Sequence, residues 1–265
     1  MSVLKLKGPS GDWGLYYEVL EKAVPYTTLF LHGHLTSHKC FLPTLEHFET
    51  KRAKAILMDW RGSGKSSPPK SDADMNLEQM GQDVHILLDK LEIEQCHIVG
   101  HDTGGLIALE AVQFNPQRFQ KILLLDSWGP RGWRIDKSTE DLYLKMALDD
   151  ELAGQTVAKT IHGFDCASNI YPSVIRPDAF ASARNIGLRL FNSLNSYNAE
   201  ERFKQILNET LIVHGKEDKV VSLKEAELLS RILPNSRLRI LEEQGHCTNI
   251  ENPKKFADLI ETYLA

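Results

Sequence analysis

The sequence has few cysteines and no long apolar run. Its four cysteines, Cys40, Cys96, Cys166 and Cys247, form no C-x-x-C pair and lack the spacing of zinc ligands. A chain of 265 residues buries enough apolar surface to fold without disulfide bonds. No segment approaches the length of a membrane span, and the first residues lack the apolar core of a secretion signal. We therefore expect a cytoplasmic protein that has no membrane partner.

An excess of charge of one sign is also missing. Lys and Arg number 31 and Asp and Glu number 36, which leaves a formal net charge of −5. Such a chain has no strong positive field for nucleic acid, so we expect no nucleic-acid partner. The 42% hydrophobic and 25% charged residues are typical of a globular protein, either a monomer or a homodimer.

Short apolar runs alternate with helical patterns along most of the chain. This alternation predicts an α/β fold with a mostly parallel sheet that helices cover on both faces. The first two runs alternate between apolar and polar residues, which predicts an antiparallel hairpin at one edge. The expected strands are SVLKLKG (2–8), LYYEVLE (15–21), TTLFLHG (27–33), AKAILMDW (53–60), CHIVGHD (96–102), KILLLDSW (121–128), ETLIVHG (209–215) and SRLRILEEQ (236–244). The expected helices include 77–93, 103–116, 223–234 and 253–264.

The alternation stops once, after the sixth strand. Residues 129–203 hold helical patterns interrupted by Pro130, Pro172 and Pro177, with no convincing strand. A stretch of this length between two strands is too long for an ordinary crossover. We expect residues 1–128 and 204–265 to form the core and residues 129–203 to form a helical cap over it.

One strand leads directly into a helix through Gly100-His101-Asp102-Thr103-Gly104. This is the G-x-nucleophile-x-G spacing of a nucleophile elbow, with Asp at the position of the nucleophile. Small residues on either side allow the sharp turn. The turn places the side chain at the carboxyl end of the sheet, beside the N-terminus of a helix. An Asp that opens a helix is more often an N-cap, so the pentapeptide alone does not decide the matter.

Three further segments at strand ends favour a catalytic site. His32-Gly33-His34 follows the third strand, where an oxyanion-hole loop is expected. Asp218 follows the seventh strand and His246 follows the eighth. The chain order is therefore nucleophile, acid, histidine, with a base that a third group can orient.

The chain resembles the α/β-hydrolase fold superfamily across nearly its whole length. The matching segments are LHGH (31–34), DWRGSGKS (59–66), GHDTGG (100–105), HGKEDKVV (214–221) and GHCTNIENP (245–253). An Asp in the elbow looks like the branch of epoxide hydrolases and haloalkane or haloacetate dehalogenases. The resemblance implies that Asp102 is the nucleophile, His246 the base and Asp218 its partner. It implies an oxyanion hole formed by the backbone N–H groups of His34 and Thr103, and it implies no cofactor and no metal.

A carboxylate nucleophile favours a particular reaction. It attacks an ester carbonyl poorly, but it displaces a leaving group from a saturated carbon and forms an alkyl ester on the enzyme. Water activated by the histidine then hydrolyses that ester. We expect a small to medium organic substrate, bound by His34, His101, Trp128 and the cap tyrosines Tyr143, Tyr171 and Tyr197.

The sequence departs from the branch at two positions that bear on the substrate. Epoxide hydrolases of this branch usually carry H-G-x-P, whereas position 35 is Leu35. Haloalkane dehalogenases have a halide-binding Trp after the nucleophile, where this chain has Thr103. The leaving group is therefore open between an epoxide oxygen, a halide and others.

Other reaction classes fit parts of the sequence. Cofactor-free dioxygenases of the same fold share a W-R-G-x-G segment, here residues 60–64, and often place the acid after the sixth strand, where Asp126 lies. They keep Ser in the elbow, and the charge of Asp102 would repel an anionic substrate; we expect Asp126 to be structural. An ester or lactone hydrolase, or a ligand-binding protein with an altered nucleophile, are further alternatives.

Overall fold

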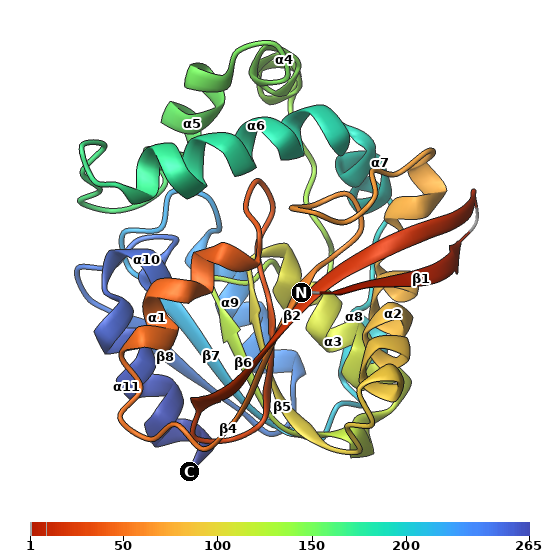
Figure 1. The fold of residues 1–265 in the computed structure, drawn as a ribbon, viewed down its shortest axis with the longest axis vertical. Coiled ribbons are helices and arrows are strands. Elements are labelled where there is room, and N and C mark those ends of the chain that lie inside the picture. Colours follow the sequence, from red (N-terminus) through yellow and green to blue (C-terminus); the bar gives the residue numbers. More distant parts are fainter. Residues whose placement is uncertain (1, 9) are drawn as a thin grey trace.

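The computed structural model describes residues 2–8 and 10–265 and contains one mixed sheet (Figure 1). All the strands expected from the apolar runs are present. They are β1 (Ser2–Gly8), β2 (Gly11–Val24), β3 (Thr28–Leu31), β4 (Ala53–Asp59), β5 (Cys96–His101), β6 (Phe119–Leu125), β7 (Glu209–Gly215) and β8 (Ser236–Leu241).

The sheet order is β1-β2-β4-β3-β5-β6-β7-β8. β1 pairs antiparallel with β2, and β2 pairs antiparallel with β4, whereas every following pair is parallel. The predicted edge hairpin and mostly parallel sheet are confirmed. Because β3, β5, β6, β7 and β8 run in parallel, their carboxyl ends meet at one edge, where the expected site residues follow them.

Alternate residues of the central strands face two separate cores. Leu29 and Leu31 of β3 pack into one core with α2 (Leu77–Lys90) and α3 (Thr103–Phe114). Phe30 packs into the other core with α1 (Leu42–Glu46) and α11 (Pro253–Leu264). All three side chains are fully buried. Strands covered on both faces must be apolar at every position, which is why they appear as uninterrupted runs.

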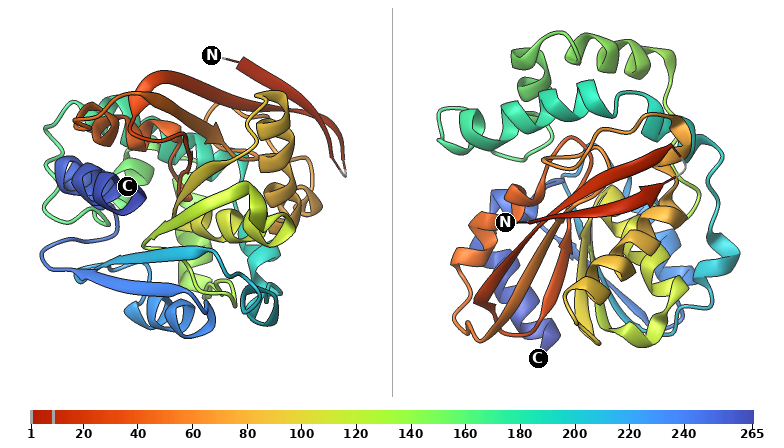
Figure 2. Two further views of the ribbon diagram at one scale, coloured as in Figure 1. Left: turned by 90° about the horizontal axis from the view of Figure 1, so that it is seen from below. Right: turned by 45° about the vertical axis from the view of Figure 1, so that its right-hand side comes forward.

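Figure 2 shows the helices on both sides of the twisted sheet. The helices of the core are α1 (Leu42–Glu46), α2 (Leu77–Lys90), α3 (Thr103–Phe114), α9 (Leu223–Ile232), α10 (Thr248–Glu251) and α11 (Pro253–Leu264). The four long helices predicted from periodicity are present. The short α1 and α10 have too few residues to show a helical period, and the sequence did not predict them.

The inserted helices follow β6, and those up to residue 185 lie across the carboxyl ends of the parallel strands, whereas the last one lies beside α3 (Figure 1). They are α4 (Lys137–Met146), α5 (Asp150–Ala158), a π-helical turn η4 (Tyr171–Ile175), α6 (Arg176–Asn185), α7 (Arg189–Asn195) and α8 (Glu200–Phe203). Helices α4 to α6 enclose a small apolar cluster of their own, whereas α7 and α8 join the core of α2 and α3. The division into a separate cap over 129–203 remains a prediction.

None of the helices in residues 2–8 and 10–265 is both long enough and apolar enough to cross a membrane.

Candidate active site

Asp102 stands at a strained turn between β5 and α3. Its φ of 53° lies in the left-handed region that a residue with a Cβ rarely adopts. The turn depends on its small neighbours: a Cβ on Gly100 would lie 2.6 Å from the Gly104 carbonyl oxygen, and one on Gly104 would lie 2.2 Å from the Leu31 oxygen. Helix α3 can therefore start directly behind the end of β3. The strained geometry fits the elbow predicted from the pentapeptide.

Both carboxylate oxygens of Asp102 have defined partners. Oδ1 accepts a hydrogen bond from the His34 backbone N–H at 2.8 Å, and Oδ2 accepts one from the Trp128 indole N–H at 2.8 Å. Oδ2 also lies 3.5 Å from His246 Nε2. Burial alone would raise the pKa of Asp102, but its hydrogen bond with His246 and the charges around it hold that pKa well below the usual range. The side chain is 4% exposed and ionised.

His246 lies between two carboxylates. Its Nδ1 is 2.9 Å from Asp218 Oδ2, and its Nε2 faces Asp102. Burial opposes the charged ring, but the charge of Asp218 and the bonds to both carboxylates raise the pKa of His246 well above its usual value. Asp218 is itself fixed, because its Oδ1 accepts the backbone N–H groups of Val220 and Val221 at 2.7 and 3.0 Å.

Asp126 is the second acid near His246, but its hydrogen bond is with a different group. Its Oδ1 accepts the Gly215 N–H at 2.8 Å, and its Oδ2 is buried without a hydrogen bond among the described residues. Complete burial, with the charge of Asp218 beside it, raises the pKa of Asp126 well above its usual value. Burial therefore favours the protonated form of Asp126, and Asp218 holds the histidine ring.

The oxyanion loop, residues Gly33 to Thr36, brings the His34 N–H to Asp102. The Gly33 carbonyl accepts hydrogen bonds from His32 Nδ1 at 2.7 Å and from the Thr36 hydroxyl at 3.0 Å. Leu35 has a φ of 60°. A proline ring holds φ near −65°, so this loop path excludes the proline of an H-G-x-P motif.

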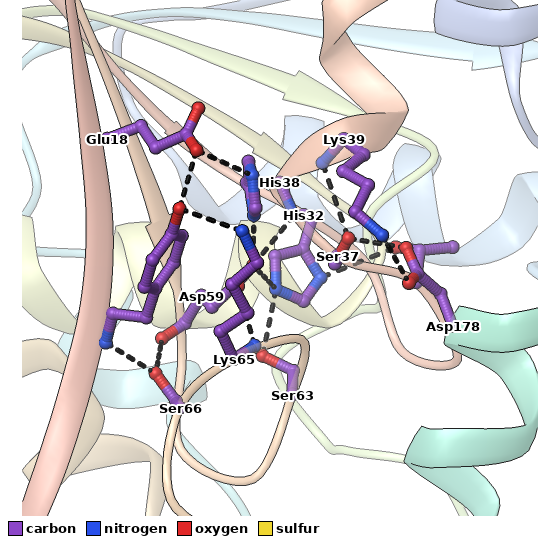
Figure 3. A network of polar contacts seen from close by, with 12 residues as sticks. Glu18, His32, Ser37, His38, Lys39, Asp59, Ser63, Lys65, Ser66 and Asp178 are labelled. Atoms are coloured by element: carbon purple, nitrogen blue, oxygen red, sulfur yellow. Dashed lines mark hydrogen bonds and ion pairs between the residues drawn. The ribbon is translucent and has the colours of Figure 1, made fainter. Parts of the chain in front are cut away.

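A buried polar network holds this loop from behind (Figure 3). Asp59, at the end of β4, accepts hydrogen bonds from the His38 backbone N–H at 2.8 Å and from the Lys65 backbone N–H at 2.9 Å. His32 Nε2 lies 2.9 Å from the Ser63 hydroxyl and 3.6 Å from Asp59. The DWRGSGKS segment of the sequence therefore supports the oxyanion loop from beneath.

A cavity of about 230 Å³ opens above Asp102. Its wall is largely apolar, and two of its aromatic rings stack: the Tyr143 ring lies parallel to the His34 ring at 5.6 Å. Trp133 also lines it and stacks on Trp128 at 4.4 Å. Burial, with the charge of Asp102, raises the pKa of Tyr143, so its hydroxyl keeps its proton. The lining residues are His34, Leu35, Thr36, His101, Asp102, Trp133, Thr139, Leu142, Tyr143, Thr156, Val157, Thr160, Lys219, Val220, His246 and Cys247.

Comparisons with known proteins show the family of this chain. The family model of the alpha/beta hydrolase fold matches residues 27–160, which is half of the chain. The 2-hydroxymuconate semialdehyde hydrolase of Pseudomonas sp. strain CF600 is 30% identical over 226 residues, 81% of this chain and 77% of that protein. The chain belongs to the alpha/beta hydrolase fold family.

A further relative and a solved structure with the same fold agree with this result. The putative carbamate hydrolase RutD of Pseudomonas savastanoi pv. phaseolicola is 28% identical over 222 residues, 81% of this chain and 85% of that protein. The crystal structure of a hydrolase from Pseudomonas aeruginosa PA01 has a TM-score of 0.82 and 22% identity over 99% of this chain and 98% of that one. At this level of description the protein is a hydrolase of the alpha/beta fold.

Within this alpha/beta hydrolase, the expected substrate-binding residues separate into two groups. His34, His101 and Tyr143 line the cavity, and Trp128 reaches Asp102 from below it. His101 also donates from Nε2 to the His246 carbonyl at 2.8 Å. Burial, together with the charge of His246, lowers the pKa of His101 to about 4, and burial lowers that of His34 to about 4, so both rings are neutral.

The structure does not bring the other two tyrosines to this cavity. The Tyr171 hydroxyl donates to Glu151 at 2.8 Å in a separate outer hollow, and the ring packs into the cluster of α4 to α6. The Tyr197 hydroxyl donates to Glu110 at 2.6 Å, next to α3. Their expected contact with substrate has no support in the geometry, because carboxylates elsewhere hold both hydroxyl groups.

Two sets of side chains lie close enough together to hold a metal ion, and both overlap the site. They are His101 with Asp126 and His246, and Asp126 with His214 and Asp218. The His246 Nδ1 already faces Asp218, and the His101 Nε2 already donates to a carbonyl. The expectation of no metal and no cofactor stays a prediction.

Several residues at the site were not predicted from the sequence. Leu142, Val157 and Thr160 of the inserted helices line the cavity, but nothing in their spacing marks them. Glu251 accepts backbone N–H groups on both sides of His246. Its signal was available, since it belongs to the GHCTNIENP segment that carries the family resemblance.

Proposed function

We propose that this protein hydrolyses a small to medium organic substrate through an alkyl ester on Asp102. His246 serves as the base for the hydrolytic water, Asp218 orients His246, and the N–H groups of His34 and Thr103 form the oxyanion hole. The proposal places the chain with the epoxide hydrolases and dehalogenases that carry an Asp nucleophile.

The observation that supports this best is the hydrogen bond from the His34 N–H to Asp102 Oδ1. In ester hydrolysis on a Ser enzyme, the oxyanion hole receives the carbonyl oxygen of the substrate. Here it already holds an oxygen of the nucleophile. When water attacks an alkylated Asp102, negative charge develops on that same oxygen, next to the donor that stabilises it. The Thr103 N–H, the first of α3, has no partner within its own helix and supplies the second donor.

In the first half-reaction, Asp102 Oδ2 attacks a saturated carbon of the substrate. A C–O bond forms, the bond to the leaving group breaks, and the leaving group takes the electron pair. The depressed pKa of Asp102 keeps the carboxylate ionised at neutral pH. The Trp128 indole fixes the position of Oδ2 and, being a donor only, cannot take a proton from it.

Alkylation also prepares the base for the second half-reaction. In the free enzyme the charges of Asp218 and Asp102 raise the pKa of His246, so the ring is protonated. Alkylation turns Asp102 into a neutral ester and removes one of these charges. The pKa of His246 then falls, and the ring can lose its proton and accept another from water. Water gives a proton to His246 and its oxygen adds to the Asp102 carbonyl carbon Cγ. The Cγ–Oδ2 bond then breaks, Oδ2 leaves with the substrate carbon and takes the proton from His246 as the product alcohol, and the new carboxyl group of Asp102 ionises.

The cavity limits the size and polarity of the substrate. About 230 Å³ with a mostly apolar wall suits a molecule of about ten non-hydrogen atoms. A second, more polar hollow of about 500 Å³ adjoins it, and the two share Thr160 and Lys219. We infer that substrates enter from this side. Tyr143 carries the proton that an epoxide oxygen would need on opening.

The alternative functions fit the geometry less well. A dioxygenase of this fold would use the acid after the sixth strand, but Asp126 accepts the Gly215 N–H, and Asp218 holds His246. An ester, lactone or carbamate substrate would have to displace Asp102 Oδ1 from the oxyanion hole. A ligand-binding role would leave the ordered Asp102–His246–Asp218 contacts without a purpose.

The direct experiment is to trap the ester in a His246→Ala variant. The variant is exposed to short alkyl bromides and terminal epoxides, digested with trypsin and analysed by mass spectrometry. We expect a stable adduct on the peptide of residues 91–118, which contains Asp102. Because Cys166 is an exposed thiol that alkylates by itself, the background carries Cys166→Ser. A control that adds Asp102→Asn should show no adduct. If no member of the panel modifies Asp102, the proposal is wrong.

A further inference from the structure

The loop that carries His246 is bound to the inserted helices through one carboxylate. Glu251, the last residue of α10, accepts the Gly245 N–H through Oε2 at 2.6 Å and the Cys247 N–H through Oε1 at 3.1 Å. These two residues flank His246. Oε1 also accepts the backbone N–H of His162 at 2.8 Å, and His162 lies between α5 and η4 of the inserted helices.

Only an acceptor fits this position. Three N–H donors converge on the two oxygens of Glu251, and a carboxylate offers acceptors alone. The amide of a Glu251→Gln variant would offer one oxygen and turn its N–H₂ group toward a backbone N–H. Glu251 therefore holds the backbone on both sides of His246 and joins it to the loop of His162.

A second carboxylate binds the oxyanion loop to the same helices. Asp178, in the first turn of α6, accepts a hydrogen bond from the Ser37 hydroxyl and lies 3.2 Å from Lys39 Nζ (Figure 3). It is 7% exposed. Ser37 directly follows the oxyanion loop, which contains Leu35 at its positive φ. A loop in a strained conformation needs contacts that keep it there, and Asp178 supplies one of them.

We propose that Glu251 and Asp178 are positioning residues. Through them, the packing of the inserted helices against the core aligns the base and the oxyanion hole for hydrolysis of the ester. This inference rests on the proposed function. Neither residue touches Asp102. Both hold loops whose groups act on the ester: His246 as base and the His34 N–H as oxyanion donor.

The inference predicts an effect confined to one half-reaction. Attack by Asp102 needs the ionised carboxylate and the bound substrate. Hydrolysis needs in addition a base and an oxyanion donor at fixed places, and small displacements of such groups reduce rates steeply. Loosening either loop should therefore leave alkylation nearly unchanged and slow hydrolysis, so that the alkylated enzyme accumulates.

The test measures both half-reactions in Glu251→Gln, Asp178→Asn and Ser37→Ala. The substrate is an alkyl bromide or epoxide that has been shown to form an adduct with the His246→Ala variant. Rapid acid quenching and intact-mass analysis give the alkylated fraction over time. We expect hydrolysis to slow about 10- to 100-fold in Glu251→Gln and less in the other two variants. Asp178→Asn combined with Ser37→Ala should be no slower than Asp178→Asn alone, because the two changes act on the same Ser37–Asp178 contact. The matched control is Glu227→Gln, an exposed Glu of α9.

The outcomes separate the two proposals. If His246→Ala forms no adduct, the alkyl-ester function itself is wrong. If it forms an adduct, but Glu251→Gln and Asp178→Asn hydrolyse the ester as fast as the control, the positioning role is wrong. Equal slowing of both half-reactions would also contradict it, since a general loss of structure would act on both. Circular dichroism and thermal unfolding establish that each variant is folded.

Discussion

At the scale of single residues, the site is a chain of charges that control one another. Asp218 and Asp102 raise the pKa of His246, and His246 in turn lowers that of Asp102. Asp126 lies beside these groups, and its complete burial raises its pKa well above the usual value. The chemistry therefore depends on which carboxylates are ionised as much as on where they lie.

The first prediction concerns the coupling between Asp102 and His246. Asn at position 102 keeps the shape of the side chain but removes its charge, so we expect the pKa of His246 to fall in Asp102→Asn. Nuclear magnetic resonance of the His246 ring across a pH titration measures it directly. Asp12→Asn, a change at an exposed position, should leave the titration unchanged. A His246 pKa that rises or does not move in Asp102→Asn would contradict the assigned switch of the base.

The second prediction concerns Asp126. A carboxyl whose folded pKa is raised stabilises the fold fully only below its unfolded pKa, and this contribution is lost as pH rises toward the folded pKa. Asn matches the neutral form at every pH. We therefore expect Asp126→Asn and the natural protein to be equally stable at about pH 4. At about pH 8 the variant should be more stable, by about 1.4 kcal/mol for each unit between the folded and unfolded pKa values of Asp126. Thermal unfolding measures this difference, and a loss of stability at the higher pH would show that Asp126 is ionised.

The third prediction distinguishes the tyrosines. Tyr143→Phe removes the hydroxyl that faces the cavity, and we expect epoxide opening to slow about 100-fold, while displacement of bromide changes far less. Tyr171→Phe is the matched control, because Glu151 already holds that hydroxyl outside the cavity. Both rates are measured as the rate of adduct formation in the His246→Ala background. Equal sensitivity of epoxide and bromide would rule out proton donation by Tyr143.

At the scale of elements, the carboxyl edge of the sheet depends on close contact between β3 and α3. A Cβ on Gly104 would lie 2.2 Å from the Leu31 oxygen and 2.5 Å from the His32 oxygen, both of them backbone atoms. The first turn of α3 and the start of the oxyanion loop therefore share one narrow space.

We expect Gly104→Ala to lower the free energy of unfolding by about 1–3 kcal/mol, because a backbone neighbour cannot move aside. It should also slow hydrolysis of the ester, since the oxyanion loop must shift. Gly14→Ala in β2 is the control: its Cβ would meet the Val3 side-chain end at 2.8 Å, and Val3 is exposed and can rotate away. Urea unfolding of both variants tests the difference. Equal stability of the two would mean that the contact of α3 with β3 is looser than the structure shows.

Sequence patterns predicted the elements better than their contacts. The buried strands appear as apolar runs because both of their faces are covered, and the order Asp102, Asp218, His246 at strand ends follows from the parallel sheet. The hydrogen bond from Trp128 to Asp102 joins residues 26 apart, and that from Ser37 to Asp178 joins residues 141 apart. Such contacts depend on how loops and inserted helices pack, which no local pattern records. For the same reason, the sequence could not show that Tyr143 lines the cavity and Tyr171 does not.

At the scale of the whole molecule, the inserted helices and the core meet over the site. The cavity wall comes from both, with Leu142, Tyr143 and Val157 from the helices and His34 and His246 from the core. Glu251 and Asp178 each form hydrogen bonds across this boundary, at the loops of His246 and His34. The inserted helices therefore cover the strained loop, His246 and Asp102 together.

In the proposed reaction, water attacks the carbonyl carbon of the alkylated Asp102 and does not attack the substrate. The most direct test is turnover in ¹⁸O-labelled water with an alkyl bromide or epoxide that loads the His246→Ala variant, followed by mass analysis of peptide 91–118. We expect heavy oxygen to enter the Asp102 carboxylate and the product of a single turnover to be unlabelled, because it leaves with Oδ2. Heavy oxygen in the product of the first turnover, with an unlabelled Asp102 peptide, would show that water attacks the substrate directly.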